Sequence, residues 1–259
     1  MPNYDDENKE SIKKQLKNAK NEITELGGLS AFKSGEWLFP LIQKSIRNYW
    51  ERADVDYFKR KYLSQDENFL AKKITKVAAR NVALIGAVAG AVVSTDEIVA
   101  LLTVGEGGIG IPANVAIALT AIASEALLLV RFQLKLVVNL GKLYGAPLDP
   151  DDPEDILTIL AFAVGGSVAE VAGKFGMKVG GHLAKKAVKG YISKEVLEAL
   201  KRIGAKIGVK ILQRSIMKYT VPVVSIGIGT GWNYFSTRTV GEIAKKHFLQ
   251  RRSEMNSNF

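Results

Sequence analysis

The chain has no cysteine among its 259 residues, and it has only two histidines and seven prolines. The absence of cysteine excludes a disulfide scaffold, a cysteine-ligated zinc site and a thiol nucleophile. The two histidines, His182 and His247, are isolated in the sequence and predict no metal site. With 47% hydrophobic residues, the chain has too much apolar surface to remain disordered, so it must bury a core.

The sequence also lacks the common catalytic motifs. It has no phosphate-binding G-x-x-x-x-G-K-[ST] loop and no zinc-binding H-E-x-x-H pattern. Residues 105–110 match G-x-G-x-x-G, but a dinucleotide site needs a strand before that motif, and 97–102 are predicted to be helical. We therefore predict a helix–helix loop at this point, with no catalytic residue, no cofactor and no metal, and we favour a non-enzyme.

The chain has a formal net charge of +10, and its charged residues are distributed unevenly along the sequence. Residues 1–80 contain 16 Lys and Arg against 12 Asp and Glu, and residues 81–170 contain 3 against 10. Residues 171–259 contain 17 against 4. A basic third behind an apolar, mildly acidic middle predicts a polyanionic partner, either a nucleic acid or an anionic membrane surface.

Helical patterns run through the whole chain and predict an all-α, compact multi-helix bundle. Residues 7–26 carry a narrow apolar stripe that we expect to dock onto the body. Residues 64–67 and 94–97 are capping boxes, and 152–155 are a helix start with proline at its first position. Glycine is unfavourable inside helices, so repeated G-x-x-x-G pairs predict close helix packing. These pairs are Gly86/Gly90, Gly176/Gly180, Gly204/Gly208 and Gly227/Gly231.

No stretch of the chain meets the requirements for a membrane span cleanly. A span needs about 20 mainly apolar residues, whereas the stretches 81–93, 113–130, 156–169 and 219–237 are short, charged or broken by proline and glycine. We favour buried helices, and shallow insertion stays open. The acidic, polar N-terminus lacks the features of a secretory signal, so we expect a cytoplasmic protein.

The strongest pattern is a row of bases near residues 200–218. Five cations recur every four residues and therefore share one broad helical face, beside an apolar row of isoleucines. This basic amphipathic helix predicts binding to an anionic surface. The alternative is a solvated face on a packed helix. The five residues are Arg202, Lys206, Lys210, Arg214 and Lys218.

Aromatic residues gather at 32–62, where they alternate with bases. Such a segment is typical of a membrane interface, although stacking on single-stranded nucleic acid or a small second core would use the same residues. The candidate interfacial rings are Trp37, Trp50, Tyr57, Phe58 and Tyr62.

Glu125 is the one carboxylate that no helix cap explains. Apolar residues surround it on its own helical face, and no base lies three or four positions away. It is therefore a candidate buried carboxylate that needs a partner from another helix. We favour a structural ion pair, for example with Arg80, over a ligand-binding or proton-linked role.

From about residue 66 onward the chain resembles the EcsC family of bacterial proteins. The resemblance rests on glycine and apolar patterns, namely 86–90 with Asp96, 107–113, 143–145 with Asp149, and 221–227 with Asn233, Ile243, Ala244 and Phe248. It implies a helical, membrane-associated protein that is sometimes encoded beside transporter components, and it supplies no catalytic residues. The expected organisation is an N-terminal segment at 1–63 and an EcsC-like helical domain at 64–259.

Together these features predict a non-enzymatic protein that is peripheral to the inner face of the cell membrane. Its expected partner is an anionic membrane surface or lipid, with a transporter component or another membrane protein as a further partner. The first alternative is a carrier that holds a lipid or hydrophobic ligand in an apolar cavity with Glu125 at its polar end. Nucleic-acid binding comes third, because the chain has no recognisable recognition module, and an enzyme that uses Glu125 comes last.

Overall fold

Residues 4–51, 55–90, 113–164, 194–219 and 225–257 are described by the computed structural model of the chain. Across these ranges the structure has nine α-helices and no strand, which confirms the predicted all-α fold. The helices are α1 (Tyr4–Glu25), α2 (Gly28–Ser34), α3 (Leu38–Glu51), α4 (Val55–Lys61), α5 (Glu67–Gly90), α7 (Ala113–Leu143), α8 (Pro153–Val164), α11 (Lys194–Tyr219) and α12 (Ser225–Ser257).

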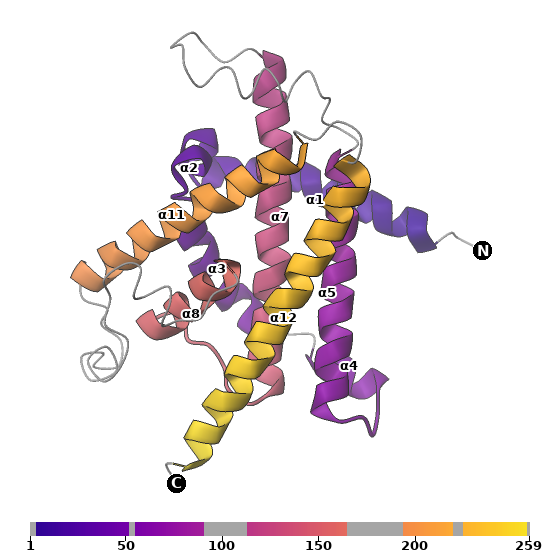
Figure 1. Cartoon of the computed structure of the whole chain (residues 1–259), viewed down its shortest axis with the longest axis vertical. Helices are drawn as coiled ribbons and strands as arrows, with labels where there is room; N and C mark the ends of the chain where they lie inside the picture. Colours follow the sequence, from indigo (N-terminus) through magenta and orange to yellow (C-terminus); the bar gives the residue numbers. More distant parts are fainter. Residues whose placement is uncertain (1–3, 52–54, 91–112, 165–193, 220–224, 258–259) are drawn as a thin grey trace.

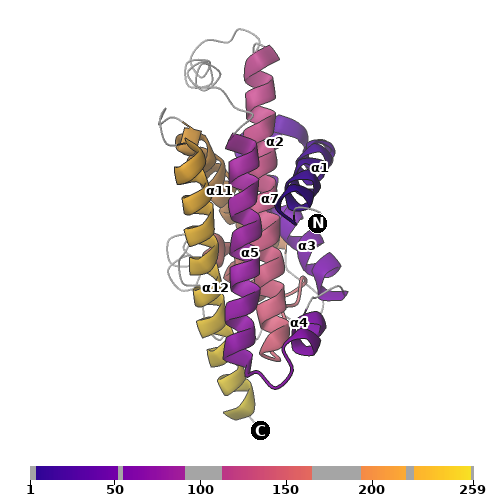
Figure 2. The same cartoon turned by 90° about the vertical axis from the view of Figure 1, so that its right-hand side faces the viewer.

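Three long helices, α5, α7 and α12, form the body and lie side by side (Figures 1 and 2). α11 lies obliquely against α7 and contacts α2, α3 and α8, whereas α1 packs on the other side of the α5 and α7 pair. One continuous cluster of buried apolar side chains includes residues of α1, α3, α5, α7, α8, α11 and α12. The predicted segments 1–63 and 64–259 therefore share one core.

The apolar stripe of α1 docks onto the body, as its spacing predicts. Ile12, Ala19 and Ile23 are buried, and Leu16 and Leu26 are partly buried against the same cluster. Most of the polar side chains described at 11–25 of this helix are exposed, so the stripe is a packing surface for α7 and α5.

Local side-chain hydrogen bonds set two of the helix starts. The Asp152 Oδ1 atom accepts the backbone N–H of Glu154 at 2.8 Å, one residue before α8 begins at Pro153, as predicted. At α5 the cap is Asp66, whose Oδ1 accepts the Phe69 N–H at 2.6 Å. The predicted cap, Ser64, instead lies in the preceding turn with a φ of 66°, because α5 begins only at Glu67.

α7 is the central helix of the body, and its 31 residues are the longest apolar element in the described ranges. By length and composition, Ile117–Leu143 is the one described helix that could cross a membrane, and 67% of its most apolar window is buried inside the protein. Packing against α1, α3, α5, α11 and α12 therefore accounts for its apolar sequence.

Glycine brings α11 into backbone contact with the turn after α2. Gly35 has a φ of 79°, and a Cβ atom at Gly208 would lie only 2.8 Å from Gly35 Cα. At Gly204 a Cβ would be 3.3 Å from Phe39 Cβ. Close packing at the Gly204/Gly208 pair is thus confirmed. It is wrong for Gly231, where a Cβ would meet no atom within 4 Å. The pair Gly176/Gly180 lies outside the described residues.

Candidate functional site

The two faces of α11 have opposite environments. Its apolar row packs into the core, with exposed fractions of 5% or less; the row consists of Leu200, Ile203, Ile207 and Ile211. The basic row faces outward, and four of its members are exposed: Arg202, Lys206, Lys210 and Arg214. The side chain of the fifth, Lys218, lies outside the described residues. α11 is thus anchored by its apolar face and presents its cations to the solvent.

Acidic residues on α11 lie before the basic row. Glu195 and Glu198 belong to the first two turns, and Glu198 accepts a hydrogen bond from Lys201 at 3.0 Å. That pair is exposed on both sides, where such contacts contribute little to stability. From Arg202 to the end of the helix the charged residues are all bases, so the outward face has a single sign of charge.

Two of the predicted interfacial aromatics are core residues, which corrects that prediction. Trp37 is fully buried and its ring stacks on Phe32 with centroids 4.5 Å apart, and Phe58 is 7% exposed. The described residues of the segment 32–62 lie mainly in α2, α3 and α4, whose apolar faces join the main cluster. These two rings cannot reach a membrane without unfolding that part of the core.

Two other candidate rings, those of Tyr57 and Tyr62, lie at the α4 end of the molecule. Tyr57 is 51% exposed, and its hydroxyl accepts a hydrogen bond from Lys61 Nζ at 2.9 Å. Tyr62 is half-buried, and the cations of Lys61 and Lys73 lie 5.9 Å and 5.6 Å from its ring centre. The side chain of Trp50 lies outside the described residues. This cluster is remote from α11 (Figure 1).

Exposed aromatic residues do occur beside α11, but on α12. Trp232 is 53% exposed and Phe235 is 67% exposed. The sequence interpretation missed both, because it treated 219–237 as a broken apolar stretch. Their spacing of three positions on an uncharged stretch was the available signal, since such residues share one side of a helix.

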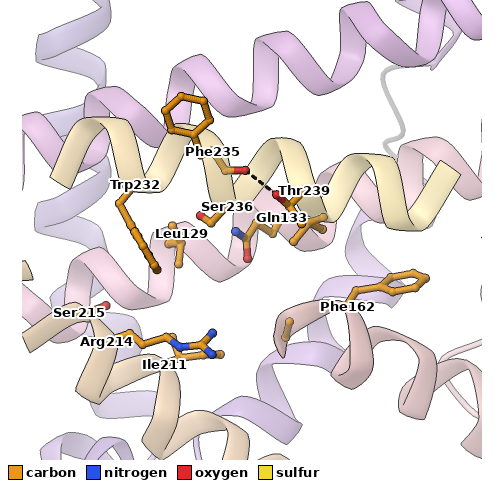
Figure 3. A pocket seen from close by; sticks show the side chains of 12 residues that line it. Leu129, Gln133, Phe162, Ile211, Arg214, Ser215, Trp232, Phe235, Ser236 and Thr239 are labelled. Carbon is orange, nitrogen blue, oxygen red and sulfur yellow. Dashed lines mark hydrogen bonds between the residues drawn. The ribbon is translucent and has the colours of Figure 1, made fainter. Parts of the chain in front are cut away.

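A shallow groove of about 330 Å³ lies between α7, α8, α11 and α12. Leu129, Phe162 and Ile211 contribute apolar lining, and Trp232 points from α12 toward α11 (Figure 3). The Arg214 side chain extends along the groove toward the Phe162 side. Of the described residues that line the groove, Arg214 is the single base and none is an acid.

Glu125 lies in a buried polar layer between α7 and α12. It is fully buried, and its Oε1 accepts a hydrogen bond from Asn233 Nδ2 at 2.8 Å. Gln133 Nε2 and Thr237 Oγ1 form a second contact between the same helices at 3.3 Å. Arg80, the ion-pair partner suggested by the sequence, is exposed on α5. Glu125 thus meets an amide of α12, and a substrate cannot reach it in this conformation.

A partly buried polar cluster also joins α8 to α12. Arg251 forms a bidentate ion pair with Asp155, whose side chain also accepts the Asp149 N–H at 2.7 Å. Burial raises the pKa of Asp155, and its contacts with Arg251 oppose that rise. Burial also lowers the pKa of His247, and the nearby Arg251 lowers it further. The cluster fastens the C-terminal helix to α8 and has a structural role.

Metal binding receives no support from the described ranges, which contain no group of three His, Cys, Asp or Glu side chains that could hold an ion. His182, the loop at 105–110 and the capping box at 94–97 lie outside those ranges. No protein family, curated protein or solved structure matches the chain. The resemblance to the EcsC family therefore stays a prediction.

Proposed function

We propose that the protein docks on an anionic membrane surface through the basic face of α11, with Trp232 and Phe235 of α12 as interfacial residues. The observation that carries this proposal is the orientation of α11. Its apolar row is buried in the protein's own core, and Arg202, Lys206, Lys210 and Arg214 are exposed together. A binding surface also explains why no acid interrupts this row of bases and why exposed aromatic residues lie on the neighbouring helix. A row of bases that is only solvated explains neither feature.

This orientation defines the kind of binding that α11 can support. Because the apolar row is buried, the helix cannot insert into the acyl region, and its contribution is electrostatic attraction at the headgroup level. Each base near an anionic leaflet contributes about 1 kcal/mol. Four such bases contribute about 4 kcal/mol, which corresponds to about a thousand-fold in affinity.

Trp232 and Phe235 complete the proposed surface. Aromatic side chains that are half or more exposed suit the membrane–water interface, where an apolar ring can lie among the headgroups. The EcsC-like patterns support the same function, and with it we propose a location at the cytoplasmic face of the membrane and a transporter component as a protein partner. The proposal contains no catalytic step.

Vesicle flotation tests the proposal. The protein should float with vesicles of phosphatidylglycerol and phosphatidylcholine, and it should remain unbound with phosphatidylcholine alone. Binding should disappear in about 1 M salt, where the Debye length falls to about 3 Å. The test variant replaces the four exposed bases of α11: Arg202→Gln, Lys206→Gln, Lys210→Gln and Arg214→Gln.

The matched control removes the same number of charges from the opposite side of the molecule. Four lysines of α1, at positions 13, 14, 17 and 20, are exposed, and α1 lies across the α5 and α7 pair from α11 and α12 (Figure 2). The control variant is therefore Lys13→Gln, Lys14→Gln, Lys17→Gln and Lys20→Gln, and it should keep most of the binding. Equal loss in both variants, or equal flotation on neutral vesicles, would refute the proposal. Loss of single-stranded DNA binding alone in the α11 variant would favour a nucleic-acid partner.

A further inference from the structure

The groove beside Arg214 combines two features that a purely electrostatic docking surface does not need. It is concave, with a volume of about 330 Å³, and its lining is mainly apolar. That volume is at the lower end of the range for ligand pockets, about 300–1,000 Å³. The groove therefore has room for one slender apolar chain rather than for a two-chain lipid.

Burial differs between the floor and the rim of the groove. Phe162, Ile211 and Val240 line it and are 5% exposed or less. Trp232 and Arg214, at the rim, are exposed. A ligand in this groove would thus contact apolar side chains along its length, and its polar end would lie in solvent beside a guanidinium group.

The charge of the rim determines which head group fits. Arg214 is the single base among the described lining residues, no acid lines the groove, and the neighbouring turn of α11 carries Lys210. A guanidinium group forms bidentate hydrogen bonds with carboxylate or phosphate oxygens, and it repels a cation. The site should therefore distinguish amphiphiles by the sign of their head group.

We propose that this groove binds a single-chain anionic amphiphile, with the acyl chain between α11 and α12 and the head group on Arg214. The inference rests on the proposed function in one respect, namely that the ligand comes from a membrane lipid. It assigns a defined site to the ligand, which is separate from the broad basic face of α11. The carboxylate Glu125, which the sequence placed at the polar end of a cavity, has no part in it.

Isothermal titration calorimetry with dodecanoate, below its critical micelle concentration, tests the site on the full chain. Dodecyltrimethylammonium is the control ligand, because it has the same apolar chain and the opposite charge. One dodecanoate should bind per protein molecule. Dodecyltrimethylammonium should bind with much lower affinity. Arg214→Gln should weaken dodecanoate binding about tenfold, the factor expected for one charge-assisted hydrogen bond, and reduce the preference for the anion.

A groove-filling variant separates this site from the membrane surface. Ala163 is a partly exposed lining residue on α8, so Ala163→Phe should abolish dodecanoate binding and leave flotation on anionic vesicles unchanged. Val77→Phe adds the same kind of bulk at an exposed position of α5 and should change neither readout. If Ala163→Phe lowers the melting temperature, Ser236→Leu at the α12 side of the groove replaces it.

The outcomes separate the two proposals. Dodecanoate binding that Ala163→Phe removes, without any vesicle binding, would support the groove and refute the membrane surface. Vesicle binding without dodecanoate binding would refute the groove alone, as would equal affinity for the two ligands. A doubled molar mass by light scattering that Ala163→Phe abolishes, without dodecanoate binding, would assign the groove to a second copy of the chain and overturn the inference.

Discussion

Replacing Gly208 by alanine should destabilise the protein, although alanine is the better helix former. Gly208 lies inside α11 and faces the backbone of Gly35, which follows α2. An added Cβ atom would be 2.8 Å from Gly35 Cα and 3.0 Å from its carbonyl carbon. Both neighbours are backbone atoms of a residue with a φ of 79°, so no side-chain rotation can relieve the overlap.

The expected magnitude follows from two opposing effects. Alanine gains about 1 kcal/mol over glycine in a helix interior. Overpacking a close contact costs about 1–3 kcal/mol. We expect a cost near the upper end of this range, because the backbone at Gly35 cannot move aside easily. The net loss in the free energy of unfolding should be about 2 kcal/mol. For a chain of this size, that corresponds to a fall of about 4–8 °C in the melting temperature.

Two other glycines provide matched controls. Gly231 lies in α12, and a Cβ there would meet no atom within 4 Å, so Gly231→Ala should raise stability by about 1 kcal/mol. At Gly204 the nearest atom is the side-chain Cβ of Phe39 at 3.3 Å, so Gly204→Ala should be close to neutral. Urea unfolding followed by circular dichroism measures all three variants. A Gly208→Ala protein as stable as Gly231→Ala would refute the close approach of α11 to Gly35.

Two further predictions concern the buried polar groups. The pKa of His247 is lowered in the folded state, so the unfolded chain binds the proton first and stability should fall as pH drops below about 6.5. Urea midpoints across this range should show a smaller slope in His247→Gln, and an unchanged slope would contradict the assignment. Asn233→Leu removes the 2.8 Å donor to Glu125 and should cost about 1–3 kcal/mol. Thermal unfolding should show partial recovery in Asn233→Leu combined with Glu125→Leu, and further loss in that double variant would contradict a mainly structural pair.

Much of the fold could be predicted because its signals are local. The stripe of α1, the Asp152–Pro153 start of α8 and the apolar row of α11 each depend on spacing within a few turns, and the structure has them where the spacing predicts. The start of α5 differed by two residues, because Asp66 and Ser64 are both acceptable caps and the choice depends on the preceding turn.

The candidate site was only partly predictable. A row of bases at every fourth position shares one face of any helix, so the grouping of these bases on one face of α11 follows from the sequence alone. Whether an aromatic residue is exposed depends on which element covers it. Trp37 lies in the turn before α3 and is fully buried, whereas Trp232 lies in α12 and is 53% exposed.

The sequence by itself determined the helical class, the single sign of charge along α11 and the absence of thiol chemistry, because these properties depend on composition and on neighbours along the chain. The tertiary structure decided which face of α11 points outward, which rings remain exposed and what Glu125 contacts. Those outcomes depend on helix–helix packing, which brings together residues that are far apart in the sequence, such as Glu125 and Asn233 at a separation of 108 positions.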